Sequence, residues 1–171
     1  MFCNYNNKSG KWCNRWFILY FNSFNNGKEG YWSDSDIRNW LNNEFINEAF
    51  SFEEQKRIPL TKISTSVYGN PFERITTEDR VFLMSVEEIE KFFVTKADRL
   101  AYPTKFAENQ RVEDKYYLLE SYFTRNHNDL YGGKSHTAVL IHETMDRTGD
   151  FVEAYWNHKA YIRPCIWVTV L

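Results

Sequence analysis

The sequence predicts an α+β fold in which most helices precede most strands. Helical periodicity and helix-capping signals lie in the first two-thirds of the 171 residues, whereas β-forming runs dominate the last third. Hydrophobic residues make up 43% of the chain and aromatic residues 18%, a composition that supports a buried core and argues against disorder. Because no repeat, low-complexity tract or linker divides the chain, we expect a single domain.

The first elements are expected to be a strand and then a long helix. Residues 15–24 are rich in β-forming side chains, and Asn25-Asn26-Gly27 follows as a turn signal. The helix should begin near Ser33 or Asp34, whose side chains can accept hydrogen bonds from free backbone N–H groups. One buried helical stripe is then expected from apolar residues at three- and four-residue steps. These residues are Ile37, Trp40, Leu41, Phe45 and Ala49.

The middle of the chain alternates between helix and strand signals. Ser51-Phe52-Glu53-Glu54 is a capping box that opens a short helix, and Pro59 ends it. Alternating apolar residues predict a strand over 60–68, which Gly69-Asn70-Pro71 breaks. The apolar run within 80–85 predicts a central strand of a sheet.

Two further helices and four strands complete the expected order. Ser85-Val86-Glu87-Glu88 is a second capping box, for a helix that runs to Phe93. Thr104 is expected to cap a short helix that runs to Ala107. Pro164 should place part of the final strand at a sheet edge or bulge. The four strands are expected over 116–123, 137–143, 151–156 and 160–171.

Charge and hydropathy limit the classes of partner. The formal net charge is −2 and the basic residues are scattered, so we expect no nucleic-acid partner. The apolar run 16–21 is too short to span a bilayer, which takes about 20 residues. The N-terminus shows no signal peptide, so the chain is expected to be soluble. Its location stays open: cytoplasmic, or exported if an upstream leader is missing.

The three cysteines form neither a disulfide framework nor a zinc site, because their number is odd and no close pair occurs. Cys165 lies in an apolar run and is expected to be a buried, inert thiol. A bridge between Cys3 and Cys13 in an oxidising compartment stays open.

Six segments occur in a characteristic order, one of them carrying an extra residue between Trp32 and Ile37. They are W-S-D-S-D-I-R-N-W-L-N at 32–42, A-F-S-F-E-E at 49–54, V-F-L-M-S at 81–85, R-L-A-Y-P-T-K-F-A at 99–107, Y-Y-L-L-E-S at 116–121 and I-R-P-C-I-W at 162–167. This order resembles a bacterial family of unknown function common in gut Firmicutes. The family motifs are W-x-S-x-I/L-R-x-W-L-N, A-F-S-x-x-E, V/I-F-L-L-S, R-x-A-x-x-T-x-x-A, W-W-L-R-S and V-R-P-A-L-W.

The resemblance covers residues 31–171, which we expect to form the α+β domain, whereas 1–30 match poorly and carry one strand. It implies a fold similar to C-type-lectin-like and formylglycine-generating-enzyme-like folds. In such folds a helix pair supports a twisted antiparallel sheet and long loops present a variable surface. Glu120 stands where the W-W-L-R-S motif has arginine. The family implies no activity that could be carried over to this chain.

Polar and aromatic residues gather around two predicted loops, within 123–136 and 143–158. Tyrosine, tryptophan and asparagine at loop tips are typical of recognition surfaces, and aromatic faces beside amides suit sugars. We therefore predict a non-catalytic binding module for an unknown protein or glycan, without a cofactor. Solvated loops with incidental rings are the alternative. The candidate residues are Tyr122, Arg125, Asn126, His127, Asn128, Tyr131, His136, Tyr155, Trp156, Asn157 and His158.

Arg163 is a further candidate ligand residue, because it interrupts the terminal apolar strand. A buried arginine needs a partner. An ion pair with Glu120 or Asp36 is the favoured structural explanation, and a ligand carboxylate or phosphate is the alternative.

Two other classes of function stay open. A divergent metal-dependent enzyme could use histidines of the last third with Glu143 or Asp146, although no H-E-x-x-H or H-x-H spacing occurs. A loop calcium site could use Asp129, Asp146, Asp150 and Glu153. We assign neither catalytic residues nor metal ligands. The third class is a structural or assembly module, with the oligomeric state open. The histidines are His127, His136, His142 and His158.

Overall fold

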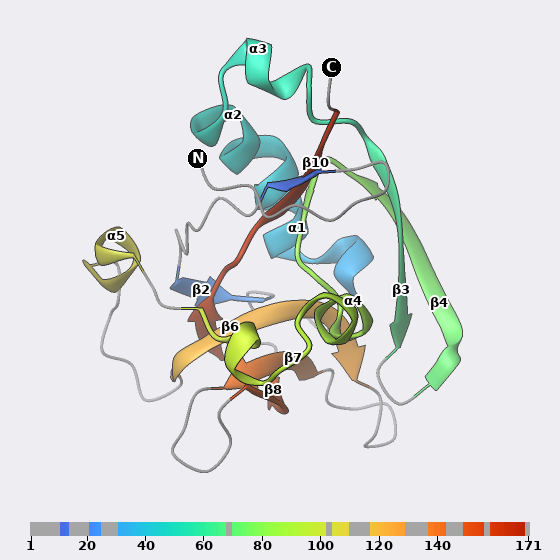
Figure 1. Cartoon of the computed structure of the whole chain (residues 1–171), viewed down its shortest axis with the longest axis vertical. Helices are drawn as coiled ribbons and strands as arrows, with labels where there is room; N and C mark the ends of the chain where they lie inside the picture. The colour runs from blue at the N-terminus through green and yellow to red at the C-terminus, as the bar shows by residue number, and fades with distance from the viewer. Residues whose placement is uncertain are drawn as a thin grey trace.

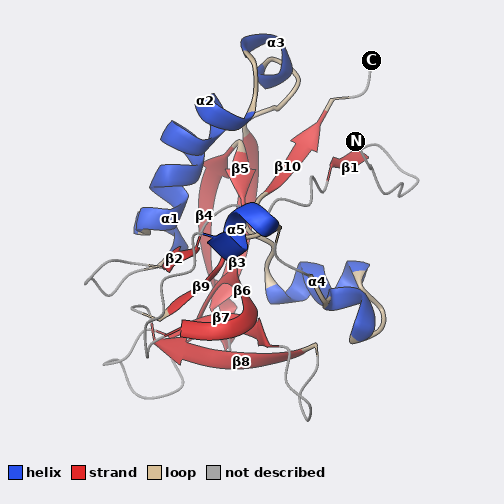
Figure 2. Ribbon diagram, turned by 90° about the vertical axis from the view of Figure 1, so that its left-hand side faces the viewer, coloured by secondary structure: helices blue, strands red, loops and turns tan. Residues whose placement is uncertain are grey.

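The fold is α+β, as predicted, with short helices packed around mainly antiparallel sheets, in which β6 and β9 form a parallel pair (Figures 1 and 2). The computed structural model describes residues 11–13, 21–24, 31–67, 70–101, 104–109, 117–128, 137–142, 149–155 and 158–169. Among these residues no helix is long and apolar enough to cross a membrane.

The predicted long helix is confirmed, as a series of short helices that follow one another without a break. A 3-10 turn, η1 (Trp32–Asp34), precedes α1 (Asp36–Trp40), the π-helical η2 (Leu41–Phe45) and α2 (Ile46–Ala49). Helix α1 begins later than predicted: the Ser35 hydroxyl, not Ser33 or Asp34, accepts the capping bond from the backbone N–H of Arg38. The predicted stripe faces the core, three of its residues buried and Trp40 and Ala49 packed against them.

The predicted capping residues of the next three helices are confirmed. Ser51 and Glu54 cap each other at the start of α3 (Phe52–Gln55), and Ser85 and Glu88 do the same for α4 (Val86–Phe92). Thr104 Oγ1 accepts a 3.2 Å bond from Ala107 N in α5 (Lys105–Asn109).

The region after residue 67 departs from the prediction. Strand β3 (Thr61–Val67) was expected, but residues 70–79 were not assigned to any element, and they form a ten-residue strand, β4 (Asn70–Asp79). β4 pairs antiparallel with β3, from Thr61 opposite Asp79 to Ser66 opposite Arg74. The Gly69-Asn70-Pro71 signal therefore precedes a partner strand rather than ending the sheet.

The strands of the last third are divided between two sheets, each of which also contains strands from earlier in the chain. A five-stranded sheet has the order β2 (Phe21–Ser23), β9 (Lys159–Tyr161), β6 (Tyr117–Asn128), β7 (Thr137–His142), β8 (Asp150–Tyr155). A three-stranded sheet has the order β1 (Lys11–Cys13), β10 (Cys165–Val168), β5 (Val81–Phe82). The predicted strand over 80–85 is buried, but β5 is short and lies at an edge.

The predicted final strand is interrupted at residues 162–164. Its first part, β9, belongs to the larger sheet, and its second part, β10, lies between β1 and β5 in the smaller one. Pro164 falls between the two strands, where it removes no hydrogen bond from either. Figure 1 shows this red segment running from the lower sheet up to the helices. In the β1–β10 pair, Lys11 lies opposite Val168 and Cys13 opposite Ile166.

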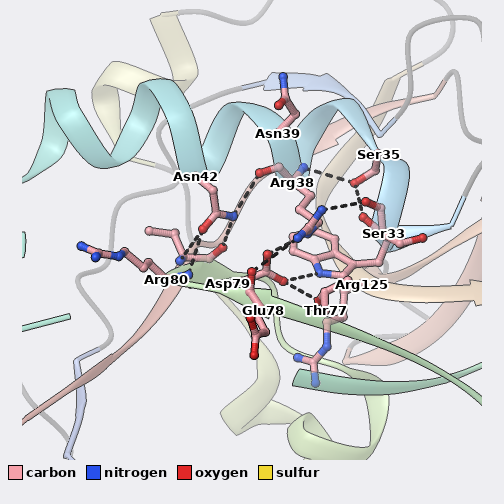
Figure 3. Close-up of polar contacts among 12 residues, drawn as sticks. Ser33, Ser35, Arg38, Asn39, Asn42, Thr77, Glu78, Asp79, Arg80 and Arg125 are labelled. Carbon is pink, nitrogen blue, oxygen red and sulfur yellow. Dashed lines mark hydrogen bonds and ion pairs between the residues drawn. The ribbon is translucent and has the colours of Figure 1, made fainter. Parts of the chain in front are cut away.

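A buried carboxylate joins the long helix to the β3–β4 hairpin (Figure 3). Asp79 is fully buried, and its oxygens accept hydrogen bonds from Trp32 Nε1 at 2.9 Å, Thr77 Oγ1 at 2.6 Å and Arg38 Nε at 2.7 Å. Asn42 adds a second connection, because its side chain bonds the backbone of Val81 in both directions. Side chains from η1, α1 and η2 thus bond to residues 79–81.

We expect Asp79→Ala to lower the free energy of unfolding by about 3 kcal/mol or more. The change leaves the buried Trp32 N–H and Thr77 hydroxyl without their acceptor and removes the counter-ion of the partly buried Arg38. Urea denaturation followed by tryptophan fluorescence measures the loss. Glu78→Ala, at the exposed neighbouring position, is the matched control and should change stability by less than about 0.5 kcal/mol. Equal effects of the two changes would contradict the role given to Asp79.

Candidate functional site

Strand register brings three residues together in the five-stranded sheet, in a row across one end of the adjacent strands β6, β7 and β8. Asn128, at the end of β6, lies opposite Thr137 at the start of β7, and Thr137 lies opposite Tyr155 at the end of β8. We call this row of three residues the recognition edge. Segment 129–136 joins the first two of them, and segment 156–157 continues from the third. Two of the predicted ligand-binding segments are therefore attached at the same place.

The candidate residues fall into three groups relative to this edge. The backbones of His127, Asn128 and Tyr155 belong to the strand ends themselves, with His127 opposite Ala138. Four other candidates are buried: Tyr122, Arg125, Asn126 and Arg163. The remaining four lie outside the described residues; they are Tyr131, His136, Trp156 and Asn157.

The predicted second loop is divided between two ends of the sheet. At the far end of β7, His142 lies opposite Asp150, and residues 143–148 connect these two strands there. Of the second predicted loop, only segment 156–157 follows directly on a residue of the recognition edge, Tyr155. His127 and His142 consequently lie toward opposite ends of the β6–β7–β8 strands.

Arg125 and Asn126 are not loop residues, which corrects the prediction that they present themselves to a ligand. Both side chains are 1% exposed and lie within β6, which continues five residues beyond its predicted end at Phe123. The β6–β7 register shifts here, because Phe123 pairs with Leu140 while His127 pairs with Ala138. Such a bulge re-aims side chains. Within it, Arg125 N bonds the carbonyl of Met84 at 3.1 Å rather than a neighbouring strand.

The Arg125 guanidinium contacts α4, β3 and the segment that follows β5. Its two terminal nitrogens bond both carboxylate oxygens of Glu88 in α4, at 2.5 and 2.7 Å. Nε donates to Thr65 Oγ1 in β3 at 2.7 Å, and Nη1 also donates to the carbonyl of Leu83 at 2.6 Å. Bidentate pairing of this kind is geometrically specific and strong. The Arg125 guanidinium therefore bonds to protein acceptors, and it connects β6 to β3 and α4.

Asn126 continues the same connection. Its Oδ1 accepts the backbone N–H of Val86 at 2.7 Å, and its Nδ2 donates to the carbonyl of Ser66 at 2.9 Å. Glu87 extends the contact to the surface through hydrogen bonds from Ser66 and Arg74. Burial alone would raise the pKa of Glu87, but these hydrogen bonds and the Arg74 charge outweigh it and lower the pKa.

Tyr122 and Arg163, two more candidates, form a buried cluster with aromatic rings. Arg163 Nη1 donates to Tyr122 Oη at 3.1 Å, and this hydroxyl donates to the carbonyl of Arg99 at 2.7 Å. The guanidinium lies 5.2 Å from the ring centroids of Tyr122 and Phe93, within cation–π range. Burial raises the pKa of Tyr122, so its hydroxyl stays protonated as a donor.

The predicted ion pair of Arg163 with Glu120 or Asp36 stays a prediction. Asp36 is exposed at the start of α1, and the Glu120 side chain lies outside the described part of the chain. The expectation that a buried arginine needs partners is confirmed, with a hydroxyl, a carbonyl and two rings in that role. Arg163 supports the junction between β9 and β10 and is not open to a ligand.

Cys165 is buried, as predicted, and burial raises the pKa of its thiol to about 12. Across the described ranges, no group of three histidine, cysteine, aspartate or glutamate side chains is placed to hold a metal ion. His158 is half-buried, and burial lowers its pKa.

The fold and these contacts define a small α+β domain whose buried charged side chains connect its sheets and helices. The chain belongs to the family described as Domain of unknown function (DUF6273), whose model matches residues 12–170. No curated protein and no solved structure matches it. The expected membership in a family of unknown function is confirmed, while the bacterial source and the lectin-like resemblance stay predictions.

We expect Arg125→Ala to lower the free energy of unfolding by about 3–5 kcal/mol, because it leaves the Glu88 carboxylate without its counter-ion. Chemical denaturation measures the change. Arg74→Ala is the matched control: this exposed arginine also pairs with a glutamate, Glu87, and its loss should cost less than about 1 kcal/mol. If both variants lose the same stability, Arg125 does not hold the fold together.

The Cys165 thiol should resist alkylation while the protein is folded. With a pKa of about 12, its thiolate fraction at pH 8 is on the order of 10⁻⁴, and the side chain is buried. In a Cys3→Ser/Cys13→Ser variant, iodoacetamide should label it at least about 100-fold faster in urea than in buffer. Mass spectrometry follows the labelling. Comparable rates in both conditions would show that the thiol is accessible.

Proposed function

We propose that this domain is a non-catalytic recognition module that binds a glycan or a protein through the recognition edge. The register of Asn128, Thr137 and Tyr155 carries the proposal, because it attaches two chemically similar segments at one place. Rigid strands that support adjacent connections are the usual arrangement of binding sites built on sheets. The resemblance to C-type-lectin-like folds is part of this proposal.

The composition of the two segments supports this choice. Tyrosine and tryptophan offer large, rigid contact areas with a polar atom, while histidine and asparagine add hydrogen bonds. The buried positions of Arg125, Tyr122 and Arg163 remove these residues from the proposed site. The revised set is His127, Asn128, Tyr131, His136, Tyr155, Trp156 and Asn157.

The register favours recognition over a metal-dependent enzyme built from the histidines. A metal centre needs its ligands within about 2 Å of one ion. His127 and His142 lie toward opposite ends of the strands, so these two candidate metal ligands are not neighbours. A structural or assembly role stays open, and sizing of the purified protein addresses it.

A thermal-shift screen tests the proposal. The probes are neutral and acidic oligosaccharides, short basic and acidic peptides, and divalent metals with and without chelator. A ligand that binds only the folded protein raises its stability, by about 2.7 kcal/mol at a hundredfold excess over the dissociation constant. We expect a glycan or peptide to raise the Tm, and we expect Tyr131→Ala and Trp156→Ala each to abolish that shift.

Phe72→Ala is the matched control, because Phe72 is an aromatic residue of β4 that is 95% exposed. It should keep both the ligand shift and the unfolding midpoint. The proposal fails if both loop variants retain the shift, or if the only shift is caused by a metal and removed by chelator.

A further inference from the structure

Strand β4 has an outer edge with which no other described strand pairs. Its partner β3 lies on the side of the larger sheet, because Thr65 and Ser66 of β3 bond to side chains of β6. Figure 1 shows β4 along the right-hand margin of the molecule. An unpaired edge offers a row of backbone N–H and C=O groups to another strand.

The usual protection of an edge strand is confined to the two ends of β4. Pro71 lies at the end next to the hairpin turn. At the other end, Arg38 Nη2 donates to the carbonyl of Glu78 at 3.4 Å, so the long helix covers the strand beyond this residue. Between these ends the strand has no proline, glycine or lysine, and its centre, residues 75–77, is β-branched. Residues 74–78 are therefore suited to pairing.

The side chains of this stretch alternate between two faces. Arg74, Thr76 and Glu78 are exposed, whereas Ile75 is partly buried and Thr77 is buried. A strand added to β4 would continue both faces, with its own polar side chains beside the three exposed ones. The chemistry of these three residues therefore determines which strand fits.

The exposed residues are complementary to a second copy of themselves. When two copies of a strand pair antiparallel about a two-fold axis, opposite residues share a face, so the axis passes through a residue. An axis at Thr76 places Arg74 of each copy opposite the partner's Glu78, and the two threonines opposite each other. Opposite charges and threonine pairs at such positions are stabilising.

The neighbouring registers lack this complementarity. An axis at residue 74 would place two arginines opposite each other, and an axis at residue 77 would place Arg74 opposite the partner's Arg80. An axis at residue 75 would leave Arg74 opposite a threonine. Like charges directly opposite each other are destabilising. Of these four registers, the charges favour the one centred on Thr76.

Arg74 is positioned to make this contact. Its Nε donates to Ser64 Oγ at 2.9 Å and its Nη2 to the Ser64 carbonyl at 3.0 Å, so the guanidinium is held across the exposed face. Its ion pair with Glu87 is long, at 3.3 Å, and the Arg74 side chain is still 41% exposed. A second carboxylate can approach this exposed side.

We propose that β4 pairs with β4 of a second copy of this chain, so that two hairpins join into one four-stranded sheet. A two-stranded hairpin is marginal alone, and added strands stabilise it. The pairing is short and buries less than the roughly 1,200 Å² of a stable interface, so the dimer is weak and dissociates on dilution. Removal of the Arg74 or Glu78 side chain therefore leaves the stability of the dilute protein nearly unchanged. This surface is separate from the recognition edge and does not depend on it.

A cysteine on the proposed axis tests the register. Opposite residues of an antiparallel pair have Cα atoms about 4.5–5.5 Å apart, which a disulfide can span. In a Cys3→Ser/Cys13→Ser background, we expect Thr76→Cys to form a disulfide-linked dimer on oxidation, followed by non-reducing gel electrophoresis.

Lys62→Cys is the matched control. Lys62 is exposed on β3, opposite Glu78, and in the proposed dimer it lies three strand spacings, about 14 Å or more, from its own copy. It should therefore form the cross-link at least about tenfold more slowly than Thr76→Cys. Equal rates for the two variants would overturn the register.

Charge reversal tests the partner. We expect sedimentation velocity to show dimers of the wild type at about 1 mM and monomers at about 10 µM. Arg74→Glu and Glu78→Arg should each weaken dimerisation at least about tenfold, because each places like charges opposite each other. The double variant restores opposite charges and should dimerise like the wild type, which excludes misfolding as the cause of the loss.

Two results overturn the proposal. A wild type that stays monomeric at about 1 mM would leave the edge to a strand of a different protein. Dimerisation that both single variants retain would place the contact on another surface. Neither result depends on the ligands of the recognition edge, so the two proposals are judged separately.

Discussion

The bidentate pair of Arg125 and Glu88 is the constraint on which the arrangement of the elements depends. A buried guanidinium is stable only if its donors are satisfied, so β3, the residues after β5 and the start of α4 must all stand at fixed positions around β6. The same carboxylate accepts the backbone N–H of Ser85 as part of the capping box. The Glu88 side chain thus determines both where α4 begins and which strand α4 lies against.

Polar contacts of this kind compensate for the small size of the sheets. A two-stranded hairpin such as β3–β4 is marginal alone. Here its inner strand bonds Arg125 and Asn126, while the end of β4 places Asp79 against Trp32 and Arg38. The hairpin is therefore fixed to the larger sheet at one side and to the long helix at the other. Directional bonds give the specificity that a small apolar contact would not provide.

The sequence predicted correctly those features that depend on interactions between residues close together in the chain. The helical stripe and the caps of α3, α4 and α5 depend on neighbours three or four positions away, so they could be predicted, whereas the cap of α1 was placed one or two residues too early. Strand β4 was missed because its residues are mostly polar and follow a glycine and a proline; its stability comes from β3. The extension of β6 was missed because Arg125 and Asn126 resemble loop residues, and only distant partners such as Glu88 and Ser66 make their burial possible. The recognition edge could not be predicted, because it depends on the register between neighbouring strands, and the sequence of a single strand does not determine that register.

The pairing of β1 with β10 determines how the molecule would respond to tension. Lys11 and Val168 lie opposite each other and closest to the two ends of the chain, so a force pulling the ends apart acts across the ladder and not along it. Antiparallel hydrogen bonds loaded in this way break one pair after another, starting at Lys11–Val168 and proceeding to Cys13–Ile166. Arg125 and Asp79 belong to neither of these two strands. The mechanical weak point of the fold is thereby kept apart from the contacts that define its shape.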